Sequence, residues 1–305
     1  MKNPNPLMLL SIAQGDAYGM ATEYIELSRD QATKDEALKF ERYVKHPTWD
    51  IAAGHYTDDT QMSIANAEVL LEYDFKSPPT MEAALGVGMK FANAYVRCFK
   101  RDPRRGYSRG LQSLLENVES GADFFLRVKR DSDKNGAAMR AVPFGVLPSE
   151  EDVYYATIEQ AKLTHDTVGG RGSALFVGLM SHYAIHTDDP FTRFRQRIRD
   201  FLRIPARDTD LVPWSGGPVV GPDVGMKTAC AVLTLLETET TLLGIAKRAI
   251  EWGGDTDTVI AVAWGIASAR MHEPLPRFLD ANLENGEYGR DYLVGLGAVL
   301  MEKYA

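Results

Sequence analysis

Apolar residues recur every three or four positions along most of this chain, which is the spacing of one face of an α-helix. Ala, Leu, Met and Glu dominate these stretches and favour helix over strand. The sequence has no sustained alternation of polar and β-branched residues. The pattern predicts a buried helix at the apolar start, 6–13, and further helices at 60–75, 81–100, 149–164, 173–185, 226–236, 241–252 and 256–271.

Each of these helices has an apolar side that must be covered by another helix. We therefore expect an all-α fold, with residues 1–305 forming a single domain. A chain of 305 residues buries about 75% of the surface that its unfolded form exposes, so no disulfide or metal is needed for folding. Gly, Pro and Asp predict long loops at 45–56, 101–108, 131–148 and 203–223, and long loops inside a helical domain are often functional.

The composition excludes several classes of protein. Acidic residues exceed basic ones by 42 to 34, giving a net charge of −8 that disfavours unspecific binding to nucleic acid or anionic membrane. Two cysteines, Cys98 and Cys230, exclude a disulfide framework and a cysteine-based zinc site. No targeting segment or membrane-spanning stretch is evident, so we expect a cytoplasmic protein.

Two acidic clusters stand where glycine-containing loops meet predicted helices. The first cluster covers residues 56–62 and includes Asp58 and Asp59, and the second covers 253–258 and includes Asp255 and Asp257. Adjacent side chains diverge on a regular helix, so each pair can converge only at a loop–helix junction. The alternative interpretation is helix capping, for which Asp and Thr are preferred residues.

A cap needs one oxygen acceptor, whereas each cluster offers two carboxylates flanked by threonine hydroxyls. Four carboxylates converging without a cation would repel one another and raise each other's pKa. Carboxylate, hydroxyl and water oxygens suit Mg²⁺, Mn²⁺ or Ca²⁺. Two divalent cations would balance four acids in charge, which predicts a paired-metal site that orients and activates water.

A third acidic stretch lies near the start of the chain. By residue type alone, Asp16 would end a helix and Glu23 would be solvated. Three motifs nevertheless occur together in one order, and they resemble the signature of the ADP-ribosylhydrolase (ADP-ribosylglycohydrolase) family. They are Gly15-Asp16-x-x-Gly19-x-x-x-Glu23, Thr57-Asp58-Asp59-Thr60-x-Met62 and Gly253-Gly254-Asp255-Thr256-Asp257-Thr258.

This family includes dinitrogenase-reductase-activating glycohydrolases and hydrolases of ADP-ribosyl-arginine and ADP-ribosyl-serine. Two more segments are similar to it: the small-residue loop 135–143, which contains Ala-Met-Arg, and Thr164-His165 followed by Gly169-Gly170. The resemblance implies an orthogonal helical bundle with a cleft that holds two Mg²⁺ or Mn²⁺ ions. The implied metal ligands are Thr57, Asp58, Asp59, Asp255, Asp257 and Thr258.

The resemblance also implies roles within this cleft. Asp257 would bridge the ions and act in catalysis with Asp58 and Asp59, and Glu23 would be a ligand or base on a mobile loop. The loop Asn135, Gly136, Ala137, Ala138, Met139 and Arg140 would follow the diphosphate and distal ribose, His165 would contact the substrate nearby, and Tyr107 would belong to a loop that closes over the ribose.

Residue chemistry alone leaves other interpretations open for these segments. Backbone N–H groups of a small-residue loop can cradle phosphate, but 135–140 could also be a plain loop before a helix. His165 could be a packed or capping histidine. Adenine could stack on Tyr107, Phe144 or Trp214, and loops 45–56 and 211–223 are candidates for reading the linked residue.

The resulting prediction is a Mg²⁺- or Mn²⁺-dependent hydrolase that removes ADP-ribose from a modified protein at the C1″ glycosidic bond, with arginine as the linked residue. One alternative is an immunity or binding protein that sequesters an ADP-ribosylated target or a transferase. Others are hydrolysis of serine-, nucleobase- or acetyl-linked ADP-ribose, or cleavage of the diphosphate itself.

Overall fold

The computed structural model describes residues 1–75, 81–203 and 211–305. Within these ranges the chain forms fifteen α-helices and three short 3₁₀-helices, and no strand. The backbone pairs outside helices at two isolated β-bridges, Asp131 with His165 and Val219 with Gly254. The predicted all-α fold is confirmed.

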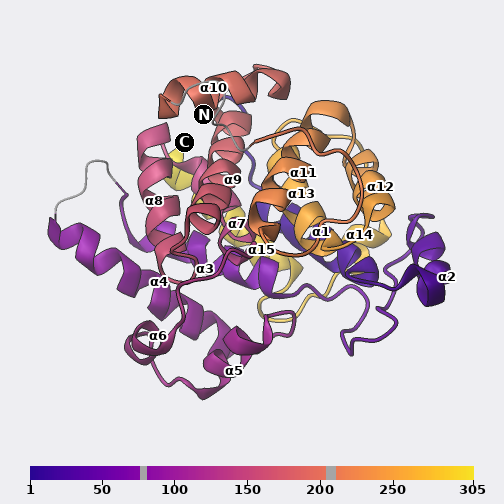
Figure 1. The fold of residues 1–305 in the computed structure, drawn as a ribbon, viewed down its shortest axis with the longest axis horizontal. Helices are drawn as coiled ribbons and strands as arrows, with labels where there is room; N and C mark the ends of the chain where they lie inside the picture. The colour runs from indigo at the N-terminus through magenta and orange to yellow at the C-terminus, as the bar shows by residue number, and fades with distance from the viewer. Residues whose placement is uncertain (76–80, 204–210) are drawn as a thin grey trace.

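Two helices from opposite ends of the chain lie side by side at the centre, α1 (Met8–Gly19) and α13 (Thr256–Ala267) (Figure 1). Every residue of both helices is buried. Glycines permit this close approach, because a Cβ atom on Gly19 would lie 2.5 Å from the Cα of Asp257. The end of α1 is therefore held against the acidic start of α13.

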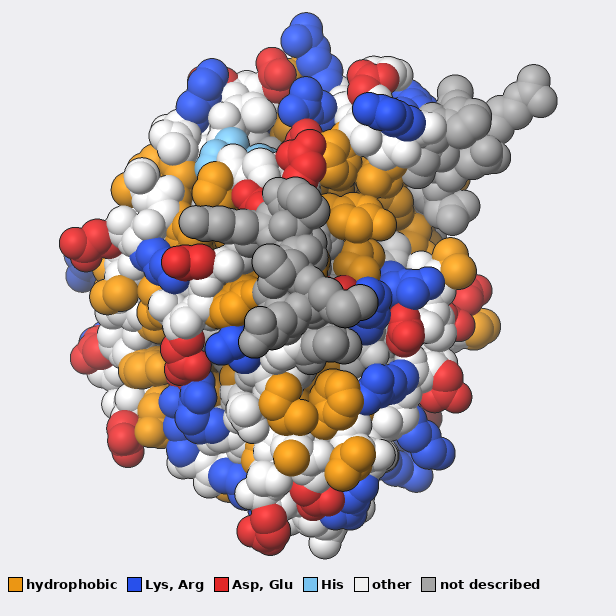
Figure 2. Space-filling view, turned by 90° about the vertical axis from the view of Figure 1, so that its left-hand side faces the viewer, with side chains coloured by type: hydrophobic (Ala, Val, Ile, Leu, Met, Phe, Trp, Pro, Cys, Tyr) orange, Lys and Arg blue, Asp and Glu red, His pale blue; other side chains and the backbone are white. Residues whose placement is uncertain are grey.

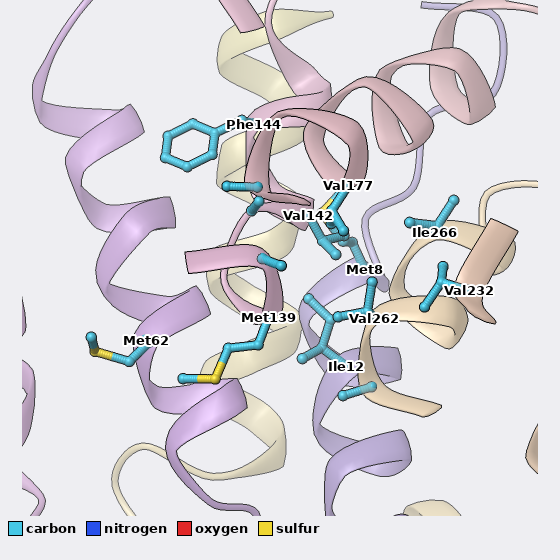
Figure 3. Packing of buried hydrophobic residues seen from close by; sticks show 14 of the residues in the cluster. Met8, Ile12, Met62, Met139, Val142, Phe144, Val177, Val232, Val262 and Ile266 are labelled. Atoms are coloured by element: carbon cyan, nitrogen blue, oxygen red, sulfur yellow. The ribbon is translucent and has the colours of Figure 1, made fainter. Parts of the chain in front are cut away.

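Further helices surround this pair and bury the apolar side chains that Figure 3 shows, among them Ile12, Val142 and Val262. Some pack directly on α1 or α13: α3 (Asp58–Glu72), α9 (Val168–His186), α11 (Val224–Thr238), α12 (Leu242–Trp252), α14 (Phe278–Ala281), α15 (Arg290–Tyr304) and the 3₁₀-helix η1 (Met20–Thr22).

Of the remaining helices, the short α7 and η2 also contact α13 and are largely buried, whereas others lie farther out. Figure 1 shows α2 at one edge of the molecule, α5 and α6 together at another, and α10 across the top. Their bounds are α2 (Leu27–Ala37), α4 (Met81–Arg101), α5 (Arg109–Asn117), α6 (Gly121–Arg127), α7 (Gly136–Met139), η2 (Val142–Val146), α8 (Glu150–Lys162), η3 (Phe191–Arg193) and α10 (Phe194–Leu202).

Each helix predicted from periodicity is present, with shifted ends. The end of α1 shifts most, from 13 to Gly19. Helix α9 begins at Val168 rather than 173, because the Thr167 hydroxyl accepts the Gly170 N–H at 3.0 Å and caps it. The predicted loop 131–148 contains α7 and η2. Helices α2, α5, α6, α10, α14 and α15 were not predicted. Of the predicted loop 203–223, residues 204–210 lie outside the described residues.

Charge is mixed on the face that Figure 2 shows, where acidic and basic side chains alternate around smaller apolar areas. Cys98 and Cys230 are both buried, in α4 and α11. None of the helices in the described ranges combines the length and the apolar character needed to cross a membrane.

Candidate active site: an acidic cluster in a cleft

The two acidic clusters meet because the helices that they begin converge. Asp58 and Asp59 occupy the first turn of α3, Asp257 the first turn of α13, and Asp255 precedes α13. The side chains line one cavity of about 1250 Å³, together with Glu23 and Thr258. The structure thus brings these acids to the loop–helix junctions where their side chains can converge.

Two groups of carboxylates within this cluster are close enough to hold a cation. Oxygen atoms of Asp16, Asp59 and Asp257 lie within 4.8 Å of one another, and so do those of Glu23, Asp255 and Asp257. Asp257 belongs to both groups, so its carboxylate lies where the two groups meet.

The cluster is under electrostatic strain. Burial, together with the charge of Asp16, raises the pKa of Asp58 to about 8. Burial and neighbouring carboxylates also raise the pKa of Asp59, Asp257 and Glu23 well above their ordinary values.

Buried oxygens without partners add to that strain. Asp59, Asp255 and Asp257 each have a buried Oδ1 atom with no hydrogen-bond partner. Hard divalent cations bind oxygen ligands, and these oxygens have no hydrogen-bond partner to compete with a cation. The residues therefore fit a magnesium or manganese site.

Capping does not explain either cluster. Neither Thr57 before α3 nor Asp255 before α13 makes a side-chain cap bond to its own helix. The start of α3 is capped instead by Asp16, which lies inside α1 and is fully buried. The interpretation of Asp16 as a helix-ending residue is therefore wrong.

Asp16 uses both carboxylate oxygens for this cap. Its Oδ2 accepts the N–H groups of Thr57 and Thr60 at 2.9 and 3.1 Å and the Thr60 hydroxyl at 2.6 Å. Its Oδ1 accepts the Thr57 hydroxyl at 2.8 Å. Asp16 thus fixes the backbone that carries Asp58, although the distances between carboxylate oxygens alone would group it with the cation-binding acids.

Tight backbone pairing shapes the loop that carries Asp255. The N–H of Asp255 donates to the Val219 carbonyl at 3.0 Å, and the Val219 N–H donates to the Gly253 carbonyl at 3.0 Å. Gly254 has a φ of +84°, and a Cβ there would lie 2.4 Å from the Val219 oxygen. Glycine is required for both reasons, and the contact joins loop 211–223 to the acidic cluster.

Contacts on both sides hold Glu23, which is half-buried beside the cluster. The next residue, Tyr24, donates its hydroxyl to Asp255 Oδ2 at 2.6 Å and its N–H to the Gly254 carbonyl at 2.8 Å. His46 Nε2 lies 2.9 Å from the Glu23 carbonyl oxygen. Because His46 Nδ1 accepts the Trp49 N–H at 2.9 Å, Nε2 carries the proton and donates it to Glu23.

A remote C-terminal residue positions the loops beside Asp58. Glu284 accepts the Tyr56 N–H at 3.0 Å and pairs with Arg104, whose guanidinium lies 3.8 Å from the Tyr56 ring centre. Loop 101–108 then approaches so closely that a Cβ on Gly106 would lie 2.3 Å from Asp58 Oδ1. Sequence reasoning did not find Asp16, Tyr24, His46, Arg104 or Glu284 in these roles, and only the motif containing Asp16 gave any signal.

The rest of the cavity lining has a different character. Asn135, Gly136, Met139 and His165 contribute to it. It also includes aliphatic and basic side chains, namely Leu111, Leu114, Arg127, Val128, Lys129 and Lys134, with the acidic residues Asp131, Asp133 and Asp223. The cavity therefore combines the acidic cluster with apolar and positively charged side chains that suit a ligand with an anionic and an apolar part.

Several predicted substrate residues support the cavity wall from behind rather than line it. Ala137, Ala138 and Arg140 are fully buried and are not among the lining residues, because α7 turns them into the core. Tyr107 is also buried, and its hydroxyl donates to Gln61 Oε1 at 2.7 Å.

The expected adenine-stacking residues and the predicted loops divide in the same way. The three aromatic residues Tyr107, Phe144 and Trp214 do not line the cavity, and Phe144 is fully buried. Loop 45–56 contributes no lining residue, whereas Gly221, Pro222 and Asp223 of loop 211–223 line the cavity.

Comparison with known proteins gives consistent relatives. A protein from Archaeoglobus fulgidus, named only as uncharacterized, is 24% identical over 317 residues that cover 96% of this chain and 94% of that protein. ADP-ribosylhydrolase ARH3 from Xenopus tropicalis is 27% identical over 157 residues, and the human protein of that name is 28% identical over 152. These two matches cover 48% and 47% of this chain but only 42% and 39% of the relatives.

The fold is also found among solved structures. One named ADP-ribosylglycohydrolase-related protein complex superposes with a TM-score of 0.71 at 18% identity, covering 99% of this chain and 98% of that one. A family model described as ADP-ribosylglycohydrolase matches residues 8–304, which include all the helices that carry the acidic cluster. The chain therefore belongs to the ADP-ribosylglycohydrolase family.

Proposed function

We propose that this chain, acting as one hydrolase domain over 1–305, removes ADP-ribose from a modified protein by cleaving the C1″ glycosidic bond. The observation that carries the proposal is a cluster of buried carboxylates, three of them with an oxygen that lacks a hydrogen-bond partner, in a cavity that basic and aliphatic side chains also line. An ADP-ribosyl group has parts that suit both kinds of lining, namely a distal ribose bearing two hydroxyls, a pyrophosphate and an adenosine.

The acidic cluster would hold two Mg²⁺ or Mn²⁺ ions through Thr57, Asp58, Asp59, Asp255, Asp257 and Thr258. When bound, such ions polarise ribose hydroxyls and lower the pKa of a bound water. Most of these acids are then engaged, so they cannot also serve as the free acid and base of an ordinary glycosidase.

Glu23 is the carboxylate best placed to move a proton. It lines the cavity beside Asp255 and Asp257, and its raised pKa suits a group that takes a proton from water and returns it to the leaving group. The contacts of Tyr24 and His46 hold the Glu23 backbone in place, so the side chain starts from a fixed position beside the cluster.

The rest of the substrate would lie along the remaining lining of the cavity. Asn135, Gly136 and His165 would contact the pyrophosphate and ribose, and Lys134 supplies positive charge nearby. Leu111, Leu114 and Val128 would enclose the adenine, because no aromatic residue expected there lines the cavity.

Arginine is the linked residue that we propose. A guanidinium leaving the sugar would emerge next to several carboxylates and to the ring of Tyr24, which is 43% exposed and can stack on a planar cation. Serine, nucleobase and acetyl linkages carry no such charge and are the competing substrates.

The test is a panel of ADP-ribosyl-arginine and ADP-ribosyl-serine proteins, ADP-ribosylated nucleobase and O-acetyl-ADP-ribose, each with Mg²⁺, Mn²⁺ or EDTA. Mass spectrometry should show free ADP-ribose, released fastest from arginine and not released in EDTA. Release of AMP instead would identify cleavage of the diphosphate and contradict the proposal.

Two variants sharpen the assay. Asp58→Ala and Asp257→Ala should each lose more activity than the roughly 10–100-fold typical of residues that only support metal ligands. Asp50→Ala is the matched control, because Asp50 is a solvent-exposed carboxylate on loop 45–56. Full activity in both cluster variants would refute the assignment.

A further inference from the structure

Behind the wall of the cleft, a chain of buried polar side chains ends at His165. We propose that Arg140 and Thr164 act as positioning residues that lock His165 in one neutral tautomer, with its Nε2–H donated to a phosphate or ribose oxygen of the substrate. The substrate part of this inference rests on the proposed function, whereas the tautomer itself does not.

The direction of the relay follows from what each group can donate. The Arg140 guanidinium has donors only, and its Nη2 lies 2.7 Å from Thr164 Oγ1. The Thr164 hydroxyl accepts that bond and turns its single proton toward His165 Nδ1, also at 2.7 Å. Nδ1 is therefore an acceptor, and in a neutral ring the proton resides on Nε2.

Arg140 is held rigidly at the start of this relay. It is fully buried, its Nε donates to Gln160 Oε1 at 2.7 Å, and its guanidinium lies 4.6 Å from the centre of the Tyr95 ring. The Gln160 amide is oriented by its own donation to the Ala137 carbonyl at 2.9 Å, so its oxygen must face Arg140.

The ring of His165 has little freedom to turn. A Cβ on Gly136 would lie 2.8 Å from its Cε1 and 3.1 Å from its Nε2, and a Cβ on Gly170 would lie 2.7 Å from its own Cβ. Gly170 therefore packs against the base of the side chain, and Gly136 packs against the Cε1–Nε2 edge of the ring on the cavity wall.

Burial and nearby positive charges keep the ring neutral. Burial is the main cause, and the positive charges of Arg140 and Lys134 add to it, lowering the pKa of His165 to about 3. Two acidic residues also lie near His165. Asp131 pairs with it through the backbone, and the Asp166 carboxylate is engaged by Arg171 at 2.8 Å. His165 is thus a fixed donor, and proton transfer is left to Glu23.

The first experiment measures the tautomer directly by NMR of the full-length protein labelled with ¹⁵N-histidine. The His165 signals are assigned by their loss in His165→Gln. We expect the Nε2–H form throughout the range from about pH 5.5 to 8, where an ordinary histidine titrates. An Nδ1–H form, or a charged ring at pH 6, would overturn the proposal.

The second experiment compares two substitutions of Thr164. Thr164→Val keeps the shape but removes the hydroxyl, so we expect mixed tautomers and an affinity for ADP-ribose weakened on the order of 10-fold. Thr164→Ser keeps the hydroxyl and should restore both properties, with thermal melting used to confirm that each variant folds. Wild-type tautomer and affinity in Thr164→Val would refute the relay.

The two proposals fail in different ways. If the wild-type protein with Mg²⁺ does not bind ADP-ribose, the proposed function is contradicted. The NMR experiment still decides whether Arg140 and Thr164 set the tautomer, because it needs no ligand.

Discussion

Asp16 and Asp257 are both buried carboxylates at the same centre, and their partners give them different roles. Asp16 accepts hydrogen bonds from two backbone N–H groups and two hydroxyls. Asp257 has a buried oxygen with no partner. A satisfied carboxylate stabilises the fold around it, whereas an unsatisfied one is available to a cation.

We predict that this difference separates two substitutions of equal size. Asp257→Asn should weaken Mn²⁺ binding more than 10-fold, because a shared ligand loses its charge. Asp16→Asn should lower the free energy of unfolding by about 1–3 kcal/mol, since an amide N–H₂ then faces the donors of Thr57 and Thr60. Calorimetric titration with Mn²⁺ and thermal melting measure the two effects. Loss of Mn²⁺ binding at unchanged stability in Asp16→Asn would instead identify Asp16 as a ligand.

At the scale of elements, the site depends on how closely helices approach. The end of α1 lies against the start of α13 at Gly19, where a Cβ would meet backbone atoms. Backbone cannot move aside as a flexible side chain can, so this contact sets where Asp257 lies.

Gly19→Ala should therefore destabilise the protein by on the order of 1–3 kcal/mol and reduce metal affinity by displacing Asp257. Gly295→Ala is the matched control, because a Cβ at that position of α15 meets no atom within 4 Å. It should stabilise the helix by about 0.5–1 kcal/mol. Chemical denaturation measures both, and a neutral Gly19→Ala would show that α1 can move without cost.

For the whole molecule, the charge of the acidic cluster links metal binding to the stability of the folded state. Burial raises the pKa of Asp58 to about 8, far above that of an unfolded aspartate. A raised carboxyl pKa means that the folded state holds a proton that the unfolded state has lost. The stability from this group is complete below the unfolded pKa of about 4 and is lost as pH rises toward 8.

We predict that the metal-free protein becomes less stable between pH 6.5 and 8, and that stabilisation by Mg²⁺ grows across the same window. The comparison starts at pH 6.5 because buried histidines such as His182, whose pKa is lowered by burial, contribute with the opposite sign below it. Thermal melting in EDTA and in Mg²⁺ provides the data, and Asp58→Asn should flatten the metal-free curve. A metal-free melting temperature that rises with pH would contradict this account.

Prediction from the sequence worked best where structure follows local spacing. The periodic segments are helices, because their apolar residues fall on one face whatever lies against it. It failed for α15, where Gly295 and the buried Gly297 weaken the helical signal, and for the start of α9, where Gly169 and Gly170 do the same.

The sequence by itself determined the helical class of this protein, the chemistry of its oxygen donors and their location at helix starts, because these properties depend on residues close together in the chain. Only the tertiary structure decided that Asp16 caps another helix, that Glu284 holds Tyr56 and that Arg140 turns into the core. Each of these depends on a contact between distant segments, and local spacing carries no information about which distant residue will be the partner.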